Sequence, residues 1–318
     1  MPFFTLRRST FAAGALAAFA LPAARRARAA DLTTIQVGSA LEDDVGVVLY
    51  AQTAGIFAHL GLDVNVAKIA SGSAGAAAVA GGTLDFAKGS VIAAVTAHAR
   101  GIPFVIVAPS TLYSLDHPVS GLLVRIDSPI RTGQDLNGKT IGVASLIDSR
   151  ILAIKAWVDQ NGGDAQTLKF TEVPSATVAG AIDAGRIDAT AASDPTLFNA
   201  LATGRVRNIA EPNAAVAKRF VITAWFTTRD AAVRSGDVVR RFRAGLQTAA
   251  LYANAHPREM AAYIAPFTGM EEAKLRQWTR AQIATSLGPA DIQPVIDVAA
   301  KYHFIDKAFP AAEMLFSA

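Results

Sequence analysis

The sequence predicts an α/β protein with two similar lobes, each a mainly parallel β-sheet flanked by helices. One observation is a repeat, because residues 82–87 (GTLDFA) return 103 positions later as residues 185–190 (GRIDAT). A second is that apolar strands of about five residues alternate with helical stretches of about 10–15 residues, a pattern typical of parallel sheets. A third is the length of 318 residues, which allows one or two domains with a full core.

The repeat covers a strand-helix-strand-helix-strand unit in each half. The expected elements are a first strand (35–39 and 141–145), a helix (47–60 and 151–161), a second strand (62–73 and 168–175), and a helix ending at residues 81–82 or at 185 before the third strand. Gly82 and Gly185 fall where a helix stops, a position that often needs a left-handed backbone. Asp85 and Asp188 enter the following strand, where a carboxylate can accept backbone N–H groups. We therefore interpret these glycines and aspartates as architectural rather than as ligand contacts.

The remaining elements predict how the two lobes are connected. Further strands are expected at residues 103–108 and 121–125, followed by a passage into the second lobe at 126–136 and a return strand at 220–228. Four helices should follow: an amphipathic one carrying Val239, Phe242 and Leu246, then helices around Met260, 275–283 and 292–302, broken at Pro257, Pro266 and Pro289. The expected division is residues 30–125 and 222–318 for the first lobe and 126–221 for the second, with a ligand cleft between them.

The first 29 residues have the layout of a cleaved export signal. Arg7 and Arg8 precede an apolar run at 11–24 that is too short for a membrane span, and residues 27–29 offer a small-x-small cleavage site. A buried first helix is the alternative. The arginine pair resembles a twin-arginine signal, and both that route and the general secretory route stay open. We expect a soluble, monomeric protein in the periplasm of a Gram-negative bacterium, without stable membrane insertion.

Composition excludes several classes of partner. Removing the signal takes away five arginines and no acidic residue. The remaining chain has 30 − 5 = 25 basic and 26 acidic residues, so its net positive charge is lost. No basic surface remains to predict nucleic-acid binding. The chain has no cysteine, which excludes disulfides and a lipid-modified N-terminal cysteine.

Ligands of open parallel sheets bind outside the carboxyl ends of the strands, and small polar residues gather at these ends here. The predicted ligand-binding residues are Ser39, Glu42, Ser71, Gly72, Ser73, Ser90, Ser145, Ser149, Ser175 and Asp194 at the strand ends, and Trp225 in the return strand. Serines at helix starts favour an anion or a polar oxygen, although each could simply cap its helix. Glu42, with Asp43 and Asp44, could hold an amine or ring N–H or could be solvated at a helix start. Trp225 could instead belong to the core.

The sequence contains no recognisable catalytic or metal-binding motif. The five histidines are scattered, and no nucleophile elbow, P-loop or dinucleotide fingerprint occurs. We therefore expect a binding protein without catalytic residues, metal site or cofactor.

Four segments carry a resemblance to a known family: residues 55–64 (GIFAHLGLDV), 71–87 (SGSAGAAAVAGGTLDFA), 135–143 (DLNGKTIGV) and 184–195 (AGRIDATAASDP). They resemble substrate-binding proteins of ABC importers of the nitrate, aliphatic-sulfonate and taurine type, a family that includes binders of the thiamine pyrimidine precursor. The resemblance implies a two-lobed periplasmic binding protein of the second type. Such a protein closes on a small polar or anionic organic solute and delivers it to a membrane permease with a cytoplasmic ATPase.

Two departures and three alternatives accompany this resemblance. The position of Asp194 is commonly Glu in the family, and the first loop is often Pro-containing, unlike residues 40–44 here. The alternatives are a binder of the pyrimidine-precursor type, an enzyme of the same fold, and a sensor that delivers its ligand to a receptor. The absence of cysteine argues against the iron-dependent pyrimidine enzyme, and the export signal argues against a cytosolic menaquinone-pathway enzyme. The identity of the ligand stays open.

Overall fold

The computed structural model describes residues 32–278 and 280–316. From Leu32 onward the chain forms one compact unit. The expected export signal, residues 1–29, lies outside the described residues.

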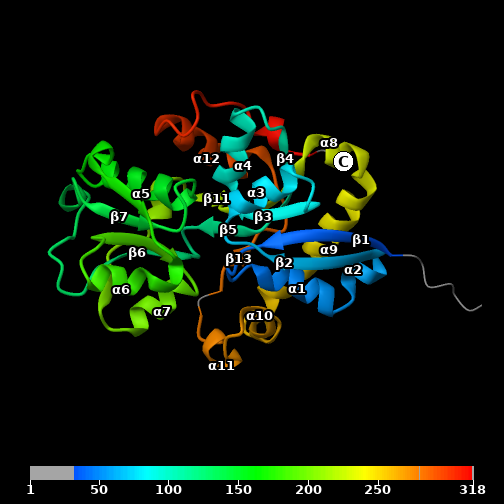
Figure 1. The fold of residues 1–318 in the computed structure, drawn as a ribbon, viewed down its shortest axis with the longest axis horizontal. Helices are drawn as coiled ribbons and strands as arrows, with labels where there is room; N and C mark the ends of the chain where they lie inside the picture. The colour runs from blue at the N-terminus through cyan, green and yellow to red at the C-terminus, as the bar shows by residue number, and fades with distance from the viewer. Residues whose placement is uncertain (1–31, 279, 317–318) are drawn as a thin grey trace, which may run out of the picture. The chain divides into compact units, whose positions relative to one another are not determined.

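The first sheet has five strands in the order β2-β1-β3-β12-β4 (Figure 1). Its strands are β1 (Thr33–Ser39), β2 (Leu62–Lys68), β3 (Phe86–Ser90), β4 (Phe104–Pro109) and β12 (Thr223–Thr228). β1 runs parallel to β2 and β3, whereas β12 runs antiparallel to both of its neighbours. Four of the five strands therefore point the same way, and their carboxyl ends share one edge.

Helices cover both faces of this sheet. One core contains α1 (Val45–Thr53), α2 (Ile56–His59), α9 (Gly236–Ala255) and α10 (Met260–Thr268), and the opposite core contains α3 (Gly72–Ala80), α4 (Val91–Ala99) and α12 (Pro289–Lys301). Successive strand residues alternate between the two cores, as the pleat requires. In β4, Val105 and Val107 join the first core, whereas Phe104 and Ile106 join the second. The strands are apolar throughout because both faces are buried.

The second sheet repeats this arrangement, with strand order β10-β6-β9-β7-β8. Its strands are β6 (Ser120–Arg125), β7 (Thr140–Val143), β8 (Lys169–Glu172), β9 (Ala189–Ser193) and β10 (Val206–Asn208). β7 is parallel to β8 and β9, and β6 is antiparallel to β9 and β10. In Figure 1, α5 (Ser149–Gln160) lies on one side of the sheet, and α6 (Val178–Asp183) and α7 (Thr196–Ala202) lie on the other. The predicted mixed α/β fold, with mainly parallel sheets flanked by helices, is confirmed.

A small antiparallel sheet, β11-β5-β13, forms where the chain passes between the two large sheets. It consists of β5 (Thr111–Ser114), β11 (Arg219–Val221) and β13 (Gln282–Ile283). The remaining elements are α8 (Arg229–Arg234), α11 (Glu272–Leu275) and the 3-10 helices η1 (Gln134–Leu136), η2 (Ala165–Thr167), η3 (Ser175–Thr177), η4 (Pro212–Ala215) and η5 (Ala311–Met314).

Two expectations about the connections are wrong. β6 pairs with β9 and β10, so the first passage between the sheets lies between β5 and β6, not at residues 126–136 after the expected boundary at Arg125. An apolar strand looks the same whichever sheet it joins, because its partners are distant in the sequence. The helix expected at 275–283 is also absent: α11 ends at Leu275, and Gln282–Ile283 pairs with β5.

The glycine and aspartate of the repeat have the architectural role that the sequence predicts. Gly82 and Gly185 follow helices with φ values of +74° and +67°. Asp85 Oδ2 accepts the N–H of Gln36 at 2.7 Å, and Asp188 Oδ2 accepts the N–H of Thr140 at 2.8 Å. Each carboxylate thereby joins the entry of the third strand of its half to the first strand.

Replacing Asp188 by alanine should lower the free energy of unfolding by about 1–2 kcal/mol, because a backbone N–H loses a charged acceptor. Asp85→Ala should have the smaller effect, since its hydrogen bond is exposed to water. Asn at either position keeps an acceptor and should restore part of the loss. Chemical denaturation of the four variants measures these differences, and a wild-type midpoint for Asp188→Ala would contradict the assigned role.

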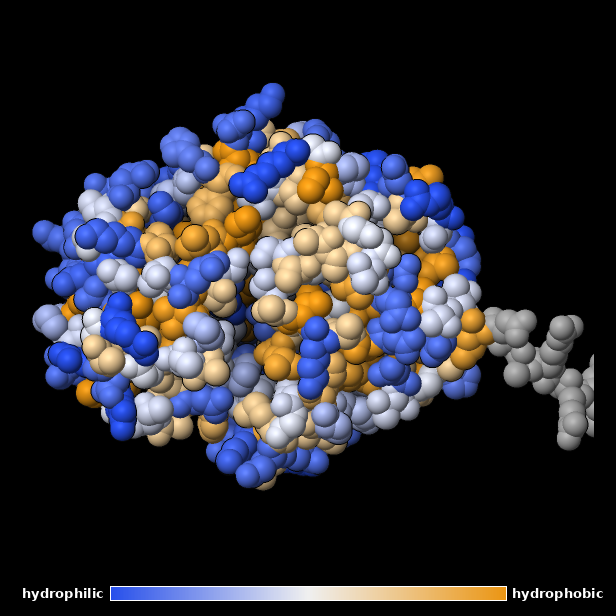
Figure 2. Space-filling model, viewed as in Figure 1, coloured by the Kyte–Doolittle hydropathy of each residue, from blue (hydrophilic) through white to orange (hydrophobic). Residues whose placement is uncertain are grey.

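The surface mixes hydrophilic and hydrophobic residues on the face drawn in Figure 2, without a continuous apolar band. Within residues 32–278 and 280–316, no helix combines the length and the apolar character that a membrane crossing requires.

Candidate functional site

The strand ends of the two sheets are joined by a contact between Glu42 and Arg150. Glu42 lies in the loop between β1 and α1, and Arg150 is the second residue of α5, in the second sheet's layer of helices. Arg150 Nη2 lies 3.3 Å from Glu42 Oε1. On the face drawn in Figure 2, a narrow recess separates the surface of the second sheet from that of the first.

Arg150 is held in place by its own half of the chain. Asp148 caps α5 by accepting the backbone N–H of Arg150 at 2.8 Å, and its other oxygen accepts from Arg150 Nη1 at 2.9 Å. Arg150 Nη2 also donates to Ser193 Oγ, at the end of β9, at 3.1 Å. The charge of Asp148, and then that of Glu42, raises the pKa of Arg150. The guanidinium is therefore a fixed, permanently charged group between the strand ends.

On the other side, Glu42 contacts Lys88, whose side chain is completely buried. Lys88 forms an ion pair with Asp44, which is also buried. Asp44 Oδ2 accepts three further hydrogen bonds, from Ser110 (2.8 Å), Thr111 (3.0 Å) and Thr223 (2.6 Å). Burial opposes ionisation of Asp44, but the charge of Lys88 and these donors hold its pKa below the ordinary value. Burial likewise disfavours the charged Lys88, yet Asp44 and Glu42 keep its pKa raised.

These contacts form one ion-pair chain: Asp44, Lys88, Glu42, Arg150 and Asp148. It holds three carboxylates and two cations, and it runs from the core of the first sheet to the start of α5. Glu42 and Arg150 are its most exposed members, with side chains that are 31% and 22% exposed. The side chain of Lys88 is fully buried. A solute that reaches this place meets one carboxylate and one guanidinium that are already paired with each other.

Asp43, the third acid of the predicted cluster, points elsewhere. It pairs with Arg280 and accepts the N–H of Ala281 at 2.9 Å. Burial raises its pKa, although Arg280 acts in the opposite direction. The interpretation of residues 42–44 as solvated helix-start acids is therefore wrong for Asp43 and Asp44.

The predicted serines lie at the strand ends, and several make local contacts there. Ser71 caps α3 by accepting the N–H of Ala74 at 3.3 Å, and its Oγ lies 2.9 Å from Ser73 Oγ. Ser145 Oγ accepts the N–H of Ile147 at 3.2 Å. Ser39 is buried at the end of β1 and donates to Ala40 O at 3.0 Å. The other serines are Ser90 at the start of α4, buried Ser149 at the first position of α5, and exposed Ser175 at the start of η3.

Close packing between α3 and β3 explains why position 72 is a glycine. A Cβ at Gly72 would lie 2.9 Å from the Cα of Gly89, so the start of α3 can approach β3 only because both positions are glycine.

Asp194 is 8% exposed and accepts the N–H of Phe198 at 2.9 Å, at the start of α7. Phe198 in turn packs against the core of the first sheet. Asp194 thus acts as an acceptor at the start of a helix.

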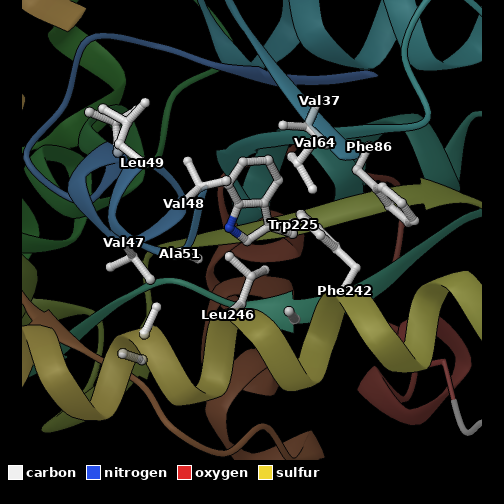
Figure 3. Close-up of a cluster of buried hydrophobic side chains, with 14 of the residues drawn as sticks. Val37, Val47, Val48, Leu49, Ala51, Val64, Phe86, Trp225, Phe242 and Leu246 are labelled. Carbon is white, nitrogen blue, oxygen red and sulfur yellow. The ribbon is translucent and has the colours of Figure 1, made fainter. Parts of the chain in front are cut away.

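Trp225 lies in the core instead of at the strand ends. It is 2% exposed, and its ring meets that of Phe242 edge to face at 5.3 Å between centroids. Figure 3 shows it among Val48, Phe86 and Leu246. A tryptophan in the middle of a two-sided strand faces one of the two cores, which explains why the expected role in the cleft is wrong.

Sequence reasoning missed the cations of the site: Lys88, Arg150 and Arg280. Lys88 had a recognisable signal, because a lysine inside the apolar strand Phe86–Ser90 must be paired when it is buried. No group of three or more metal-ligating side chains is found in the part of the chain that the structure describes.

Comparison with solved structures identifies the fold. The structure is similar to the periplasmic aliphatic sulphonate-binding protein SsuA from Escherichia coli (TM-score 0.72, 18% identity, 89% of this chain and 92% of that one). It is also similar to the alkanesulfonate-binding protein SsuA from Xanthomonas axonopodis pv. citri bound to MOPS (0.75, 18%, 91% and 100%). A third similar structure is the nitrate-binding protein NrtA from Synechocystis PCC 6803 (0.73, 12%, 89% and 85%). The chain thus has a periplasmic binding protein fold.

No curated protein sequence matches this chain. A family model does match: the one described as NMT1/THI5 like aligns with residues 43–260. This range contains the first sheet apart from β1, all of the second sheet, and every member of the ion-pair chain except Glu42. Because the match spans more than half of the sequence, the protein belongs to the NMT1/THI5-like family.

Proposed function

We propose that this protein is the solute-binding component of an ABC importer and that it binds a small organic anion without converting it. Two lobes, built on the two large sheets and connected through the segments around β5 and β11, would close on the solute. The fold, shared with sulfonate- and nitrate-binding proteins, supports this role. The observation that carries it is the contact between Glu42 and Arg150, which joins the strand ends of the two sheets.

Arg150 is the proposed anchor for the anionic group of the solute. Its Nη1 is engaged by Asp148 at 2.9 Å, whereas its Nη2 contacts Ser193 and Glu42 at 3.1 and 3.3 Å. Hydrogen bonds between charged groups are usually about 2.7–2.9 Å long, so the contact with Glu42 is a loose one. A carboxylate or sulfonate can replace Glu42 at Nη2, and the hydroxyl of Ser193 gives it a second donor.

The neighbouring strand ends supply the remaining polar groups. The start of α3, near Ser71 and Ser73, places backbone N–H groups where an anion is stabilised, and Ser145 adds a hydroxyl from the loop before α5. Glu42, once displaced from Arg150, keeps its contact with Lys88. Asp194 can accept an N–H of a solute that carries one. A solute with an acidic group and an N–H, as in an aminosulfonate, satisfies both kinds of group.

The transport context follows from the same proposal. The chain would be exported to the periplasm, act as a monomer, and deliver its solute to a membrane permease driven by a cytoplasmic ATPase. A solute-binding protein must release its cargo unchanged, which separates this function from that of an enzyme with the same fold.

A thermal-shift screen tests the proposal. Alkanesulfonates, taurine, nitrate, small carboxylates and pyrimidines are the compounds to compare. A cognate solute at 100 times its dissociation constant should add about 2.7 kcal/mol to the free energy of unfolding, which is a melting shift of several degrees for a chain of this size. We expect an anionic hit that mass spectrometry recovers unchanged. A converted product would support an enzyme, and a hit confined to neutral or cationic compounds would contradict the anion site.

A further inference from the structure

A separate cavity of about 510 Å³ lies along the edge of the first sheet. It is bordered by the edge strand β4, by α9, by the segment from Ile283 to Pro289, and by η5 with the residues that follow it. None of the charged members of the ion-pair chain lines it. Its volume is within the range of about 300–1,000 Å³ that small-molecule sites in proteins occupy.

The walls of this cavity combine apolar side chains with polar ones such as Ser110, Gln247 and Thr285. The apolar ones include Ile106, Leu246, Ile283 and Leu315. Leu246 and Trp225, which Figure 3 draws next to each other, form part of the boundary on the α9 side. An apolar cavity of about 150 Å³ already binds benzene, so this one has room for a ring or an aliphatic chain.

One wall carries a cation, Arg243, that has no carboxylate partner among the described residues. Arg243 of α9 donates from Nε to Val107 O at 2.6 Å and from Nη2 to Phe316 O at 2.7 Å. A guanidinium has five N–H groups, so three are left for other acceptors. Within residues 32–278 and 280–316, Arg243 forms no ion pair, in contrast to Arg150 and Arg280. Burial is the cause that lowers the pKa of Arg243.

The two carbonyl contacts fix the direction of the guanidinium. Val107 belongs to the edge strand β4, and Phe316 follows η5, so Arg243 links the two sides of the cavity. A positive charge that is partly desolvated and has no counter-ion is costly. An anion beside Arg243 would recover that cost, and its apolar remainder would replace water along the walls.

We propose that this cavity is a second ligand site, which takes an organic monoanion with an apolar body, such as a medium-chain carboxylate. The acidic group pairs with the free N–H groups of Arg243, and the hydrocarbon lies against Ile106, Leu246 and Leu315. This site is independent of the solute site at Arg150, because the two have no charged residue in common.

Titration calorimetry with octanoate tests the proposal on the full chain. Octanoate should bind with a stoichiometry of one, and 1-octanol should bind at least tenfold more weakly because it lacks the charge. Arg243→Gln should weaken octanoate binding at least tenfold. Arg240→Gln is the matched control, since Arg240 lies on the same helix, is exposed and pairs with Asp237; octanoate binding should be unchanged.

A cavity-filling variant covers the case in which Arg243→Gln does not fold. Ala312 is exposed and lines the cavity, so Ala312→Phe fills the space while leaving Arg243 in place. Octanoate binding should fall at least tenfold in this variant and stay at the wild-type level in Arg150→Gln. Three results would overturn the proposal: no octanoate binding by the wild type at millimolar concentration, binding that survives both cavity variants, or binding that is lost in Arg150→Gln alone.

Discussion

Replacing Lys88 by methionine is expected to lower the free energy of unfolding by about 3–5 kcal/mol, the usual effect of removing one partner from a buried ion pair. Lys88 is completely buried and is the only cation paired with Asp44 among the described residues. Its loss leaves the carboxylate of Asp44 buried with three hydroxyl donors and no counter-charge. Urea denaturation monitored by tryptophan fluorescence measures the change.

The pH dependence of this loss is a second observable. In the wild type the pKa of Asp44 is lowered, so its stabilisation is present above the unfolded value of about 3.9 and is lost as the pH falls through the folded value. The pKa of Lys88 is raised, so its contribution is lost as the pH rises through the folded value, above about 10.4. In Lys88→Met, burial of Asp44 favours its protonated form instead. The deficit should therefore be smaller at pH 4 than at pH 7.

The double variant Asp44→Asn/Lys88→Met is the control for this prediction. It removes both charges, so most of the lost stability should return, since a neutral replacement of a buried pair is often tolerated. A single variant that unfolds like the wild type, or a deficit that is the same at pH 4 and pH 7, would contradict the assigned role of the pair.

Replacing Arg150 by glutamine is expected to weaken binding of the anionic solute about 100-fold, or about 2.7 kcal/mol. The melting temperature of the solute-free protein should change little. Asp148 would still cap α5, and Glu42 would still contact Lys88. The measurement is calorimetric titration with the compound that the thermal-shift screen identifies.

Two further variants make this result specific. Arg205→Gln removes an exposed arginine that lies just before β10 and pairs with Asp183, and this variant should bind the solute normally. Glu42→Gln removes the carboxylate that competes for Arg150 and should raise the affinity severalfold. Wild-type affinity in Arg150→Gln would place the anion elsewhere, and weaker binding in Glu42→Gln would mean that Glu42 holds the solute itself.

Much of the fold could be predicted because residues close together in the sequence determine it. The repeated helix-stop glycines and strand-entry aspartates, Gly82 with Asp85 and Gly185 with Asp188, mark the same turn twice, and the structure shows the same hydrogen bond in both halves. The sheet to which β6 belongs could not be predicted in this way. Its pairing with β9 is a contact between distant segments, and periodicity carries no information about partners.

The location of the candidate site could likewise be predicted, whereas the contacts between its residues could not. Its location at the strand ends follows from the direction of parallel strands, and Glu42 is found there. The partners of Glu42 are Lys88, 46 residues away, and Arg150, 108 residues away, and only the folded chain brings them together. The two roles considered for Trp225 could not be separated from the sequence, because an aromatic side chain in a buried strand has the same pattern whether it faces a core or a cleft.

The position of β12 has a consequence for how the chain is made. All five strands of the second sheet lie within residues 120–208, so this sheet is complete once that stretch has left the ribosome. The first sheet needs Thr223–Thr228 between β3 and β4, and these two strands have unpaired edges until that segment is synthesised. The sheet that begins first along the chain is therefore completed last, and until then its open strand edges are free to pair with other chains.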